Sequence, residues 1–333
     1  NPMMQTDGLR PPLIIPTVML ILACPRTAVA TEKGKVGTMH EHVPHHAVDL
    51  YRLCWQLESW LRTMVYVELR AMYSKWEAPL KQAASDWPPS SLSQDKRLGH
   101  MQTPHQAGIS YLSFPELWSV IANRKHWPCF EPYFPPRDNV LARIQEVMTI
   151  RNRVAHFRHP HSNDLMRMAL FIGDMEGGVL AFWNRYSSPV RSPKPLEDPV
   201  SVLLEASWER RGYGIEMHRF ESSWLYAPQP HRGKPLVNAS LYLLQHPDTK
   251  LAPNGDIYWL VMHSFQGQFD IEYFINATKE HHCKLIHIMP HGELNELAVS
   301  IPAVLGPEVV SDLIFRLLST AVQASRGGSR GNP

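Results

Sequence analysis

The sequence predicts two folded units in succession: an all-α helical bundle, followed by an α+β domain with a mainly antiparallel sheet. Three observations lead to this fold class. Apolar residues recur at helical spacing through the first half of the chain. Short runs rich in β-branched and aromatic residues, separated by turn residues, replace that pattern in the second half. A proline-rich stretch at residues 187–199 divides the two patterns.

The length of the chain also favours two domains. It has 333 residues, more than one ordinary domain contains. The dividing stretch, SSPVRSPKPLEDP, carries four prolines and is typical of an extended linker. The predicted parts are an extension at residues 1–46, either disordered or translated from upstream of a true start at Met39; a helical domain at 47–186; the linker at 187–199; an α+β domain at 200–324; and a disordered tail at 325–333.

Apolar stripes predict the helices of the first unit, and proline- or serine-rich stretches predict its loops. Helices are expected at residues 47–76, after the N-cap Ser113 with Glu116 three positions on, from the N-cap Asp138 into residues 151–156, and at 165–183 with interruptions at Gly173, Gly177 and Gly178; loops are expected at 85–108 and 127–136. Glu58 and Arg62 should form a solvated i, i+4 pair. The sum is a bundle of four or five helices.

In the second unit, the change of period predicts strands between two flanking helices. Helices are expected at residues 200–211 and 307–324, and strands at 215–220, 236–244, 257–263, 269–275, 284–289 and 297–301. This unit contains no phosphate loop, dinucleotide fingerprint or metal-ligand spacing. We therefore expect it to sense a trigger, bind a partner or select a substrate rather than perform the chemistry.

Charge and cysteine usage exclude several classes of protein. The net charge of +2 argues against a surface that binds polyanions over its whole extent, although it allows a local basic patch. The four cysteines, Cys24, Cys54, Cys129 and Cys283, are far apart in the sequence. This spacing argues against a disulfide scaffold and a cysteine zinc site, and fits a reducing compartment. We expect a cytoplasmic protein that needs no metal or cofactor.

The apolar run at residues 13–24 leaves another class open. It is too short for a membrane span but has the length of a signal-peptide core, and its end at Cys24 resembles a weak lipoprotein cleavage site. Prolines within it disfavour the helix that such a core forms. We favour the extension described above, with no membrane attachment, over a lipid-anchored envelope protein.

The most informative stretch is the hexad RNRVAH at the end of the helix predicted from Asp138. It contains Arg151, Asn152 and His156. A guanidinium can hold a phosphate with its bidentate fork, and an imidazole can accept or donate a proton near neutral pH. Asn152 lies one helical turn before His156, so its amide can orient the imidazole or contact the phosphate.

Three segments around this hexad resemble a known family. They are LESWLR, YLSFPELWSVI and LARIQEVMTIRNRVAHFRHP, in this order. Together they resemble the HEPN superfamily, in the form found in abortive-infection and toxin-type ribonucleases, over about residues 49–175. Catalytic members carry an arginine followed four to six residues later by a histidine, often with a polar residue directly after the arginine. Arg151, Asn152 and His156 match that pattern.

The resemblance implies metal-independent RNA cleavage, in which the ribose 2′-hydroxyl attacks the adjacent phosphate. His156 would transfer protons and Arg151 would stabilise the developing charge on the phosphorane oxygens. A separation of five residues points these two side chains away from each other on an ideal helix. Family members pair two copies about a two-fold axis, so we expect a homodimer through the helical domain, with a shared cleft.

Basic residues flank the predicted catalytic residues. Between residues 151 and 167, Arg151, Arg153, Arg158 and Arg167 are accompanied by one acid, Asp164. We therefore predict that Arg153, Arg158 and His159 bind the RNA substrate, although Arg153 and Arg158 could equally be solvated.

Two further alternatives concern His156 and the domain as a whole. His156 could be a core histidine that caps a helix turn, and the helical domain could be a catalytically silent HEPN module that binds RNA or nucleotide or mediates dimerisation. An active enzyme would suit a toxin or an antiviral defence effector, with an antitoxin or trigger acting through the α+β domain.

Overall fold

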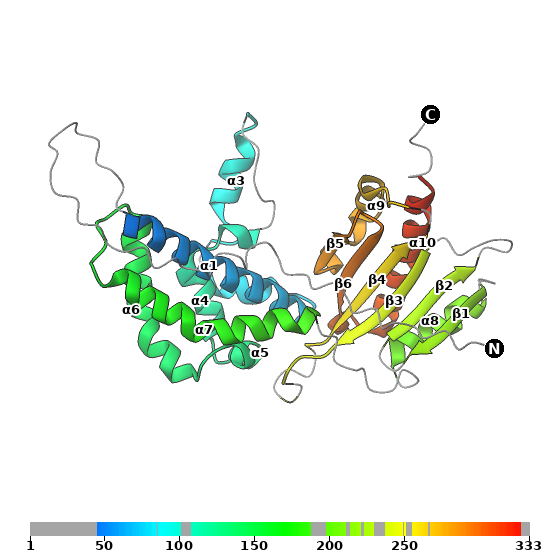
Figure 1. Ribbon diagram of the computed structural model, residues 1–333, viewed down its shortest axis with the longest axis horizontal. Coiled ribbons are helices and arrows are strands. Elements are labelled where there is room, and N and C mark those ends of the chain that lie inside the picture. The colour runs from blue at the N-terminus through cyan, green and yellow to red at the C-terminus, as the bar shows by residue number, and fades with distance from the viewer. Residues whose placement is uncertain are drawn as a thin grey trace, which may run out of the picture.

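The computed structural model describes residues 45–84, 86–100, 108–187, 198–210, 214–220, 223–229, 237–248, 250, 255–265 and 267–327. The apolar run ending at Cys24, nearly all of the predicted extension and linker, and most of the predicted tail lie outside these residues. Within them, a helical unit is followed by an antiparallel sheet with its own helices (Figure 1). This arrangement confirms the predicted fold class.

The helical unit is organised around its first long helix. Its elements are α1 (His45–Met72), α2 (Ala78–Ala83), α3 (Ser90–Arg97), η2 (Gly108–Tyr111), α4 (Phe114–Ala122), α5 (Trp127–Phe130), η3 (Glu131–Tyr133), α6 (Arg137–Ala155) and α7 (Asp164–Ser187). Helices α4, α6 and α7 all pack against α1. The predicted apolar stripe of α1 faces them, and Leu57, Leu61 and Met64 are each 1% exposed. Burial of this stripe is the main stabilisation of the bundle.

Two predicted helix starts had different outcomes. Ser113 caps α4 as predicted: its amide and its hydroxyl both donate to Glu116, at 2.7 and 2.6 Å, within a complete capping box. The prediction that Asp138 caps α6 was wrong, because the N-cap is Pro136 and the helix begins at Arg137. Asp138 lies instead in the first turn, where its negative charge interacts favourably with the positive end of the helix dipole.

Both predicted loops of the helical unit contain helix. The stretch at 85–108 includes α3, whose N-cap is Pro89, and the stretch at 127–136 includes α5 and η3. Helix α5 carries a proline in its first turn. A proline there needs no amide hydrogen bond and has a suitable φ, so it starts a helix rather than breaking it.

Helix α7 is continuous through the glycines that were expected to interrupt it. Gly178 has a packing reason. A Cβ built on it would lie 1.8 Å from the Tyr133 carbonyl oxygen. The missing side chain therefore allows the backbone of η3 to rest directly against α7.

The second unit is a six-stranded sheet in which every paired neighbour is antiparallel. Its elements are α8 (Pro199–Arg210), β1 (Gly214–Phe220), β2 (Ser223–Gln229), β3 (Val237–Leu244), β4 (Ile257–Ser264), α9 (Ile271–Ala277), η5 (Lys279–Lys284), β5 (His287–His291), β6 (Glu296–Pro302), η6 (Ala303–Leu305) and α10 (Pro307–Gly327). The strand order is β1-β2-β3-β4-β6-β5. The sheet therefore has a hairpin at each edge, β1-β2 at one and β5-β6 at the other.

The predictions in this unit failed at three places. The strand expected at 269–275 is helix α9, because the Asp270 carboxylate accepts the Tyr273 amide at 2.9 Å and caps a helix. Strand β2 was not predicted. Strand β5 begins at His287 rather than at residue 284, because η5 extends to Lys284.

The two faces of the sheet pack against different layers. Along β4, Tyr258, Leu260 and Met262 belong to the core beneath α8 and α10, whereas Ile257 and Trp259 belong to the core of the helical unit. This alternation follows the period of two in a strand. The hydrophobic core of the helices therefore continues onto one face of the sheet.

A buried polar group joins the two units, and we call it the junction cluster: Glu68, Tyr133, Arg185 and His246. Arg185 pairs with Glu68 at 2.8 Å, and the Tyr133 hydroxyl donates to the same carboxylate at 3.1 Å. The second Glu68 oxygen lies 3.5 Å from His246 Nε2. Arg185 also donates to the Gly255 carbonyl, just before β4. Helices and sheet are thus connected by polar contacts as well as by packing.

No helix in the described part of the chain has both the length and the apolar character needed to cross a membrane.

Candidate functional site

Helix α6 ends just before His156, where the chain turns at the surface. His156 is the C-cap, with φ −102° and ψ 17°, and Phe157 follows in the left-handed region at φ 53°. The Phe157 amide donates to the Val154 carbonyl at 3.1 Å. The Arg158 amide donates to the Arg153 carbonyl at 2.9 Å. These two bonds form the Schellman arrangement that closes a helix C-terminus.

The residues after α6 form an exposed segment that we call the α6–α7 turn, residues 156–163. The side chains of His156, Phe157, Arg158 and His159 are all exposed. Among the described residues, the His156 ring has no hydrogen-bond or ion-pair partner. It is therefore not the core histidine that the sequence left open as an alternative.

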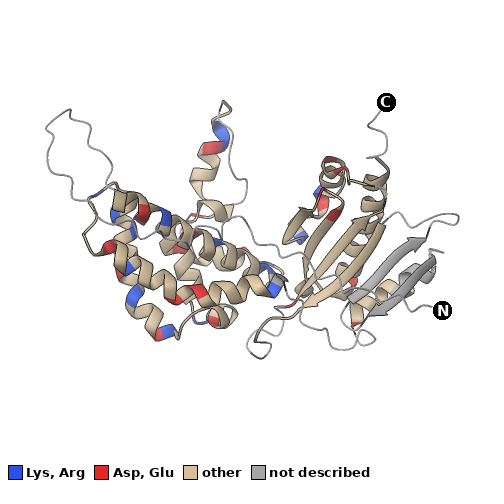
Figure 2. Ribbon diagram, in the orientation of Figure 1, with Lys and Arg blue, Asp and Glu red and all other residues tan. Residues whose placement is uncertain are grey.

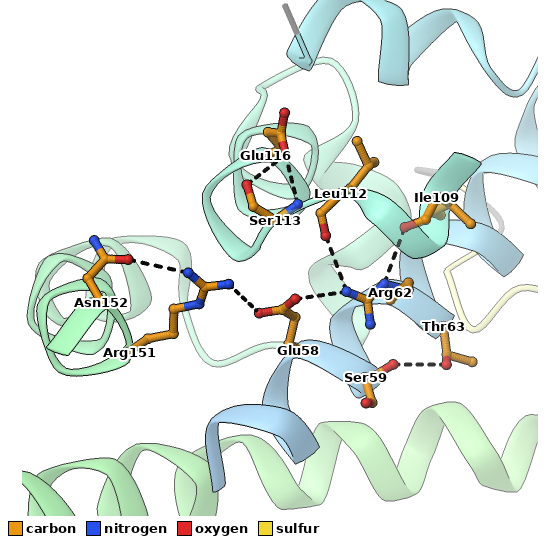
Figure 3. Close-up of polar contacts among 10 residues, drawn as sticks. All are labelled: Glu58, Ser59, Arg62, Thr63, Ile109, Leu112, Ser113, Glu116, Arg151 and Asn152. Carbon is orange, nitrogen blue, oxygen red and sulfur yellow. Dashed lines mark hydrogen bonds and ion pairs between the residues drawn. The ribbon is translucent and has the colours of Figure 1, made fainter. Parts of the chain in front are cut away.

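Arg151 is held by a carboxylate from α1 (Figure 3). Its Nη2 lies 3.2 Å from Glu58 Oε2, and the other Glu58 oxygen pairs with Arg62 at 2.8 Å. Arg62 also donates to the carbonyls of Ile109 and Leu112, both at 3.2 Å. We call Arg62, Glu58 and Arg151 the Glu58 bridge. It fixes the last turns of α6 against α1 and the segment before α4.

The Glu58 bridge retains a net positive charge, because one carboxylate lies between two guanidiniums. The Arg151 side chain is 23% exposed. Its only other hydrogen bond among the described residues goes to Asn152 Oδ1, at 3.5 Å. A guanidinium carries more N–H donors than these two contacts use. Arg151 can therefore bind an anion while Glu58 holds it in place.

Cys54 lies one turn before Glu58 on α1. Burial raises the pKa of its thiol to about 11, although the positive charge of Arg151 acts in the opposite direction. A thiol with so high a pKa is protonated at neutral pH and is a poor nucleophile. Cys54 is therefore not a candidate nucleophile, and Arg151 and His156 are the remaining candidates in this region.

The structure does not bring all of the predicted catalytic side chains into contact. The His156 amide donates to the Asn152 carbonyl at 3.2 Å, but among the described residues no hydrogen bond or ion pair joins the His156 ring to the side chain of Arg151 or Asn152. The Asn152 amide bonds to Arg151 instead. Within one chain, the guanidinium and the imidazole are neighbours along the end of α6 without forming a closed site.

Three of the four arginines between residues 151 and 167 have acidic partners. Besides Arg151 in the Glu58 bridge, Arg153 lies 2.7 Å from Asp164, and Arg167 pairs with Glu146. Arg158 has no ion-pair partner among the described residues. Figure 2 shows acidic and basic residues interleaved over these helices rather than a patch of one sign. Most of the basic residues that flank the predicted catalytic residues are therefore neutralised, and Arg158 is the exception among the four arginines.

The predicted substrate-binding residues differ in their surroundings. Arg153 contacts both Asp164 oxygens, at 2.7 and 2.9 Å, and the Asp164 carboxylate also accepts the His161 amide at 2.8 Å. Asp164 is 3% exposed. This contact gives Arg153 a structural role at the start of α7. Arg158 and His159 project from the turn, and binding of RNA by all three stays a prediction.

The sequence analysis did not predict the roles of two residues in this region. Glu58 was expected to be half of a solvated pair on α1, but it also pairs with Arg151 on another helix. Its appearance in the segment LESWLR, ahead of the hexad, was the available signal. Phe157 directly follows the predicted histidine, and no local pattern marked its left-handed backbone.

No protein family, curated protein or solved structure matches this chain. The resemblance to the HEPN superfamily therefore depends on the three sequence segments alone. In the described part of the chain, no three or more His, Cys, Asp and Glu side chains are grouped so that they could hold a metal ion.

Proposed function

We propose that the helical unit is an HEPN-type endoribonuclease domain that cleaves RNA without a metal ion. The observation that carries this proposal is the end of α6. There, an arginine held by the Glu58 bridge and an exposed histidine lie within the last turns of one helix. These are the two groups that phosphodiester cleavage by an internal hydroxyl needs.

The proposed reaction is a transesterification. A base removes the proton of the ribose 2′-hydroxyl, the 2′-oxygen bonds to the adjacent phosphorus, and the bond from phosphorus to the 5′-oxygen breaks. An acid protonates the leaving 5′-oxygen. The products carry a 2′,3′-cyclic phosphate and a 5′-hydroxyl. His156 serves as base or acid, Arg151 stabilises the phosphorane oxygens, and Asn152 supports Arg151 through its amide oxygen.

The need for two proton transfers is an argument for a homodimer. One chain supplies one predicted proton-transfer group, His156, whereas the reaction uses a base and an acid. A two-fold axis near the α6–α7 turn would bring the imidazoles of two copies to one phosphate. The separation of Arg151 and His156 within one chain supports the same arrangement.

The first test compares wild type with His156→Ala on structured RNA in the presence of EDTA. His100→Ala is the matched control, because His100 is an exposed histidine outside the proposed site. Wild type and the control should cleave to cyclic-phosphate ends, and His156→Ala should not. Equal cleavage by all three, dependence on added metal, or plain 3′-hydroxyl ends would each refute the mechanism.

A catalytically silent HEPN module is the second candidate. The ion pair between Arg151 and Glu58, and the absence of a described contact from either residue to His156, favour it. Such a module would bind RNA in the same assay without cutting it. RNA binding by purified wild type, with no cleavage at any concentration tested, would select this alternative.

An active enzyme of this kind would act in the cytoplasm as a toxin or a defence effector, with an antitoxin or trigger acting on the α+β domain. The junction cluster supports this proposal, because it links the two units and would connect a trigger on the α+β domain to the helical unit. Expression of wild type should arrest growth of the host cell, and His156→Ala should be tolerated at the same protein level. Equal growth with both would argue against a toxin.

A further inference from the structure

Phe157 is the most exposed large apolar side chain in the described part of the molecule. Its side chain is 98% exposed, whereas the next, Met166, is 68% exposed. An isolated exposed apolar residue is common on protein surfaces. This one differs because almost none of its ring contacts the protein, so packing does not explain its presence.

The backbone of Phe157 does not explain it either. Its φ of 53° lies in the left-handed region, where a side chain crowds the following carbonyl group. The position is the one after the helix C-cap, which glycine usually occupies. A phenylalanine therefore strains the turn and exposes an aromatic ring to water. Strain kept at a surface position points to a function.

The neighbours of Phe157 suggest which function. His156 precedes it and Arg158 follows it, and both side chains are exposed. Arg158 has no ion-pair partner among the described residues, so its charge is available to an anion. An aromatic face, a cation and a proton-transfer group therefore occupy three consecutive residues. Aromatic side chains beside cationic groups are the combination that binds single-stranded nucleic acid.

We propose that Phe157 stacks against an unpaired base beside the phosphate that His156 and Arg151 contact. This inference rests on the proposed RNA-directed function. In an A-form duplex the bases are already stacked and paired, so an aromatic side chain on a rigid turn cannot reach a base face. The substrate class is therefore single-stranded RNA, in a loop, bulge or end. Arg158 binds the neighbouring backbone phosphate.

The test measures binding in the His156→Ala background, where the RNA should stay intact. The probe is a short single-stranded oligoribonucleotide containing 2-aminopurine, whose fluorescence is quenched by stacking, with the same strand in a duplex as comparison. Three variants separate the possible roles of Phe157. Phe157→Tyr keeps a ring, Phe157→Leu keeps apolar bulk without a ring, and Phe157→Gly removes both and relieves the backbone strain.

The His156→Ala protein, which is the parent of the three variants, and the tyrosine variant should bind the single strand with equal affinity and quench the probe. The leucine and glycine variants should bind about 5- to 100-fold more weakly, without quenching. The parent should bind the duplex no better than the glycine variant binds the single strand. Thermal melting checks folding: the glycine variant should be at least as stable as its parent, so its weaker binding would reflect the lost ring.

Failure of this inference can be told apart from failure of the proposed nuclease activity. If wild type cleaves RNA through His156 but all Phe157 variants bind and cleave equally, stacking is wrong and the nuclease stands. If wild type cleaves nothing but binding still depends on an aromatic at position 157, stacking stands in a silent module. If the leucine variant binds as the parent does, or if light scattering shows that Phe157→Gly dissociates a dimer, the ring contacts protein rather than a base.

Discussion

The molecule contains the same three chemical groups at two places, in different environments. A guanidinium, a carboxylate and an imidazole contact one another in the junction cluster, and the same three groups lie near the end of α6, where the guanidinium and carboxylate pair and the imidazole stays separate. The first set is Arg185, Glu68 and His246; the second is Arg151, Glu58 and His156. Their comparison shows which features distinguish a buried structural cluster from the candidate site.

In the junction cluster, burial leaves little access for a ligand. The Arg185 and Glu68 side chains are 2% and 0% exposed, and both His246 ring nitrogens contact backbone groups, at 3.0 and 3.1 Å. At the end of α6, Arg151 and Glu58 are 23% and 19% exposed. Residue types alone would rate the two sets equally. Solvent exposure makes the second set the candidate site.

The largest effect expected from this comparison is the loss of activity in His156→Ala. Removing a general acid or base lowers the rate by about 10²- to 10⁴-fold, while the free energy of unfolding should change by less than about 0.5 kcal/mol because the ring is exposed. RNA cleavage rates and urea unfolding measure the two quantities. A variant that loses stability along with activity would remove the contrast with the junction cluster.

Glu68→Ala should show the reverse pattern. Removing one partner of a buried ion pair leaves an uncompensated charge, here on Arg185, and destabilises by about 3–5 kcal/mol. Urea unfolding should reveal this loss, and Glu68→Gln should be milder because it keeps the shape and one hydrogen-bond acceptor. Near-wild-type stability of the alanine variant would mean that the junction cluster contributes little to the fold.

Glu58→Gln tests whether the Glu58 bridge serves activity or only structure. Loss of the charge should loosen Arg151 and lower the cleavage rate by up to about 100-fold, because small misplacements of a catalytic group have effects of this order. The free energy of unfolding should fall by about 1 kcal/mol or less, since the pair is partly exposed. Arg62→Gln is the control on the other side of the carboxylate. A loss of stability with unchanged rate would make the bridge structural.

A third imidazole sharpens the comparison through pH. Burial, and then the positive charge of Arg70, lower the pKa of His287 to about 4. The unfolded chain, with a histidine pKa near 6.5, binds more protons than the folded chain between these values. Stability should therefore be complete above about pH 6.5 and fall by about 1–3 kcal/mol as the pH drops to 4. Unfolding of wild type and His287→Gln across this range measures the difference, which should vanish if His287 is not the group responsible.

The smallest expected effect is a gain in stability. Phe157→Gly should increase the free energy of unfolding by about 1 kcal/mol, because glycine adopts a positive φ without strain. Urea unfolding of Phe157→Gly and Phe157→Ala separates the contributions, since alanine removes the ring but keeps a Cβ. A destabilised glycine variant would show that the ring stabilises the fold through contacts outside the described residues.

The parts of the fold that follow local rules were predictable from the sequence. The apolar stripe of α1, the capping box of Ser113 and Glu116, and most strand positions follow from residue spacing. Helix α9 was mistaken for a strand because its apolar residues fit either period, and the Asp270 cap decided the outcome. The proline-rich stretch at 127–136 hid helix α5 for another reason: a proline in the first turn starts a helix rather than breaking it.

The candidate site was predictable only where its geometry is local. The positions of Arg151 and His156 at the end of one helix follow from the sequence, and the structure agrees. The pairing of Arg151 with Glu58 joins residues that are 93 positions apart, so no local pattern contains it. The pairing of Arg167 with Glu146 likewise depends on how two helices pack. Such partners determine how much positive charge is left for a ligand.

The continuity of the hydrophobic core across both units has a practical consequence. Trp259, Ile286 and Ala298 of the second unit are packed into the core of the helices. Cleavage of the polypeptide between α7 and α8 would expose this shared core to water on both fragments. The amino-terminal fragment alone would then carry an exposed apolar face and tend to aggregate. The two fragments should associate when they are co-expressed, because each covers the apolar face of the other. The helices and the sheet therefore form one cooperative folding unit.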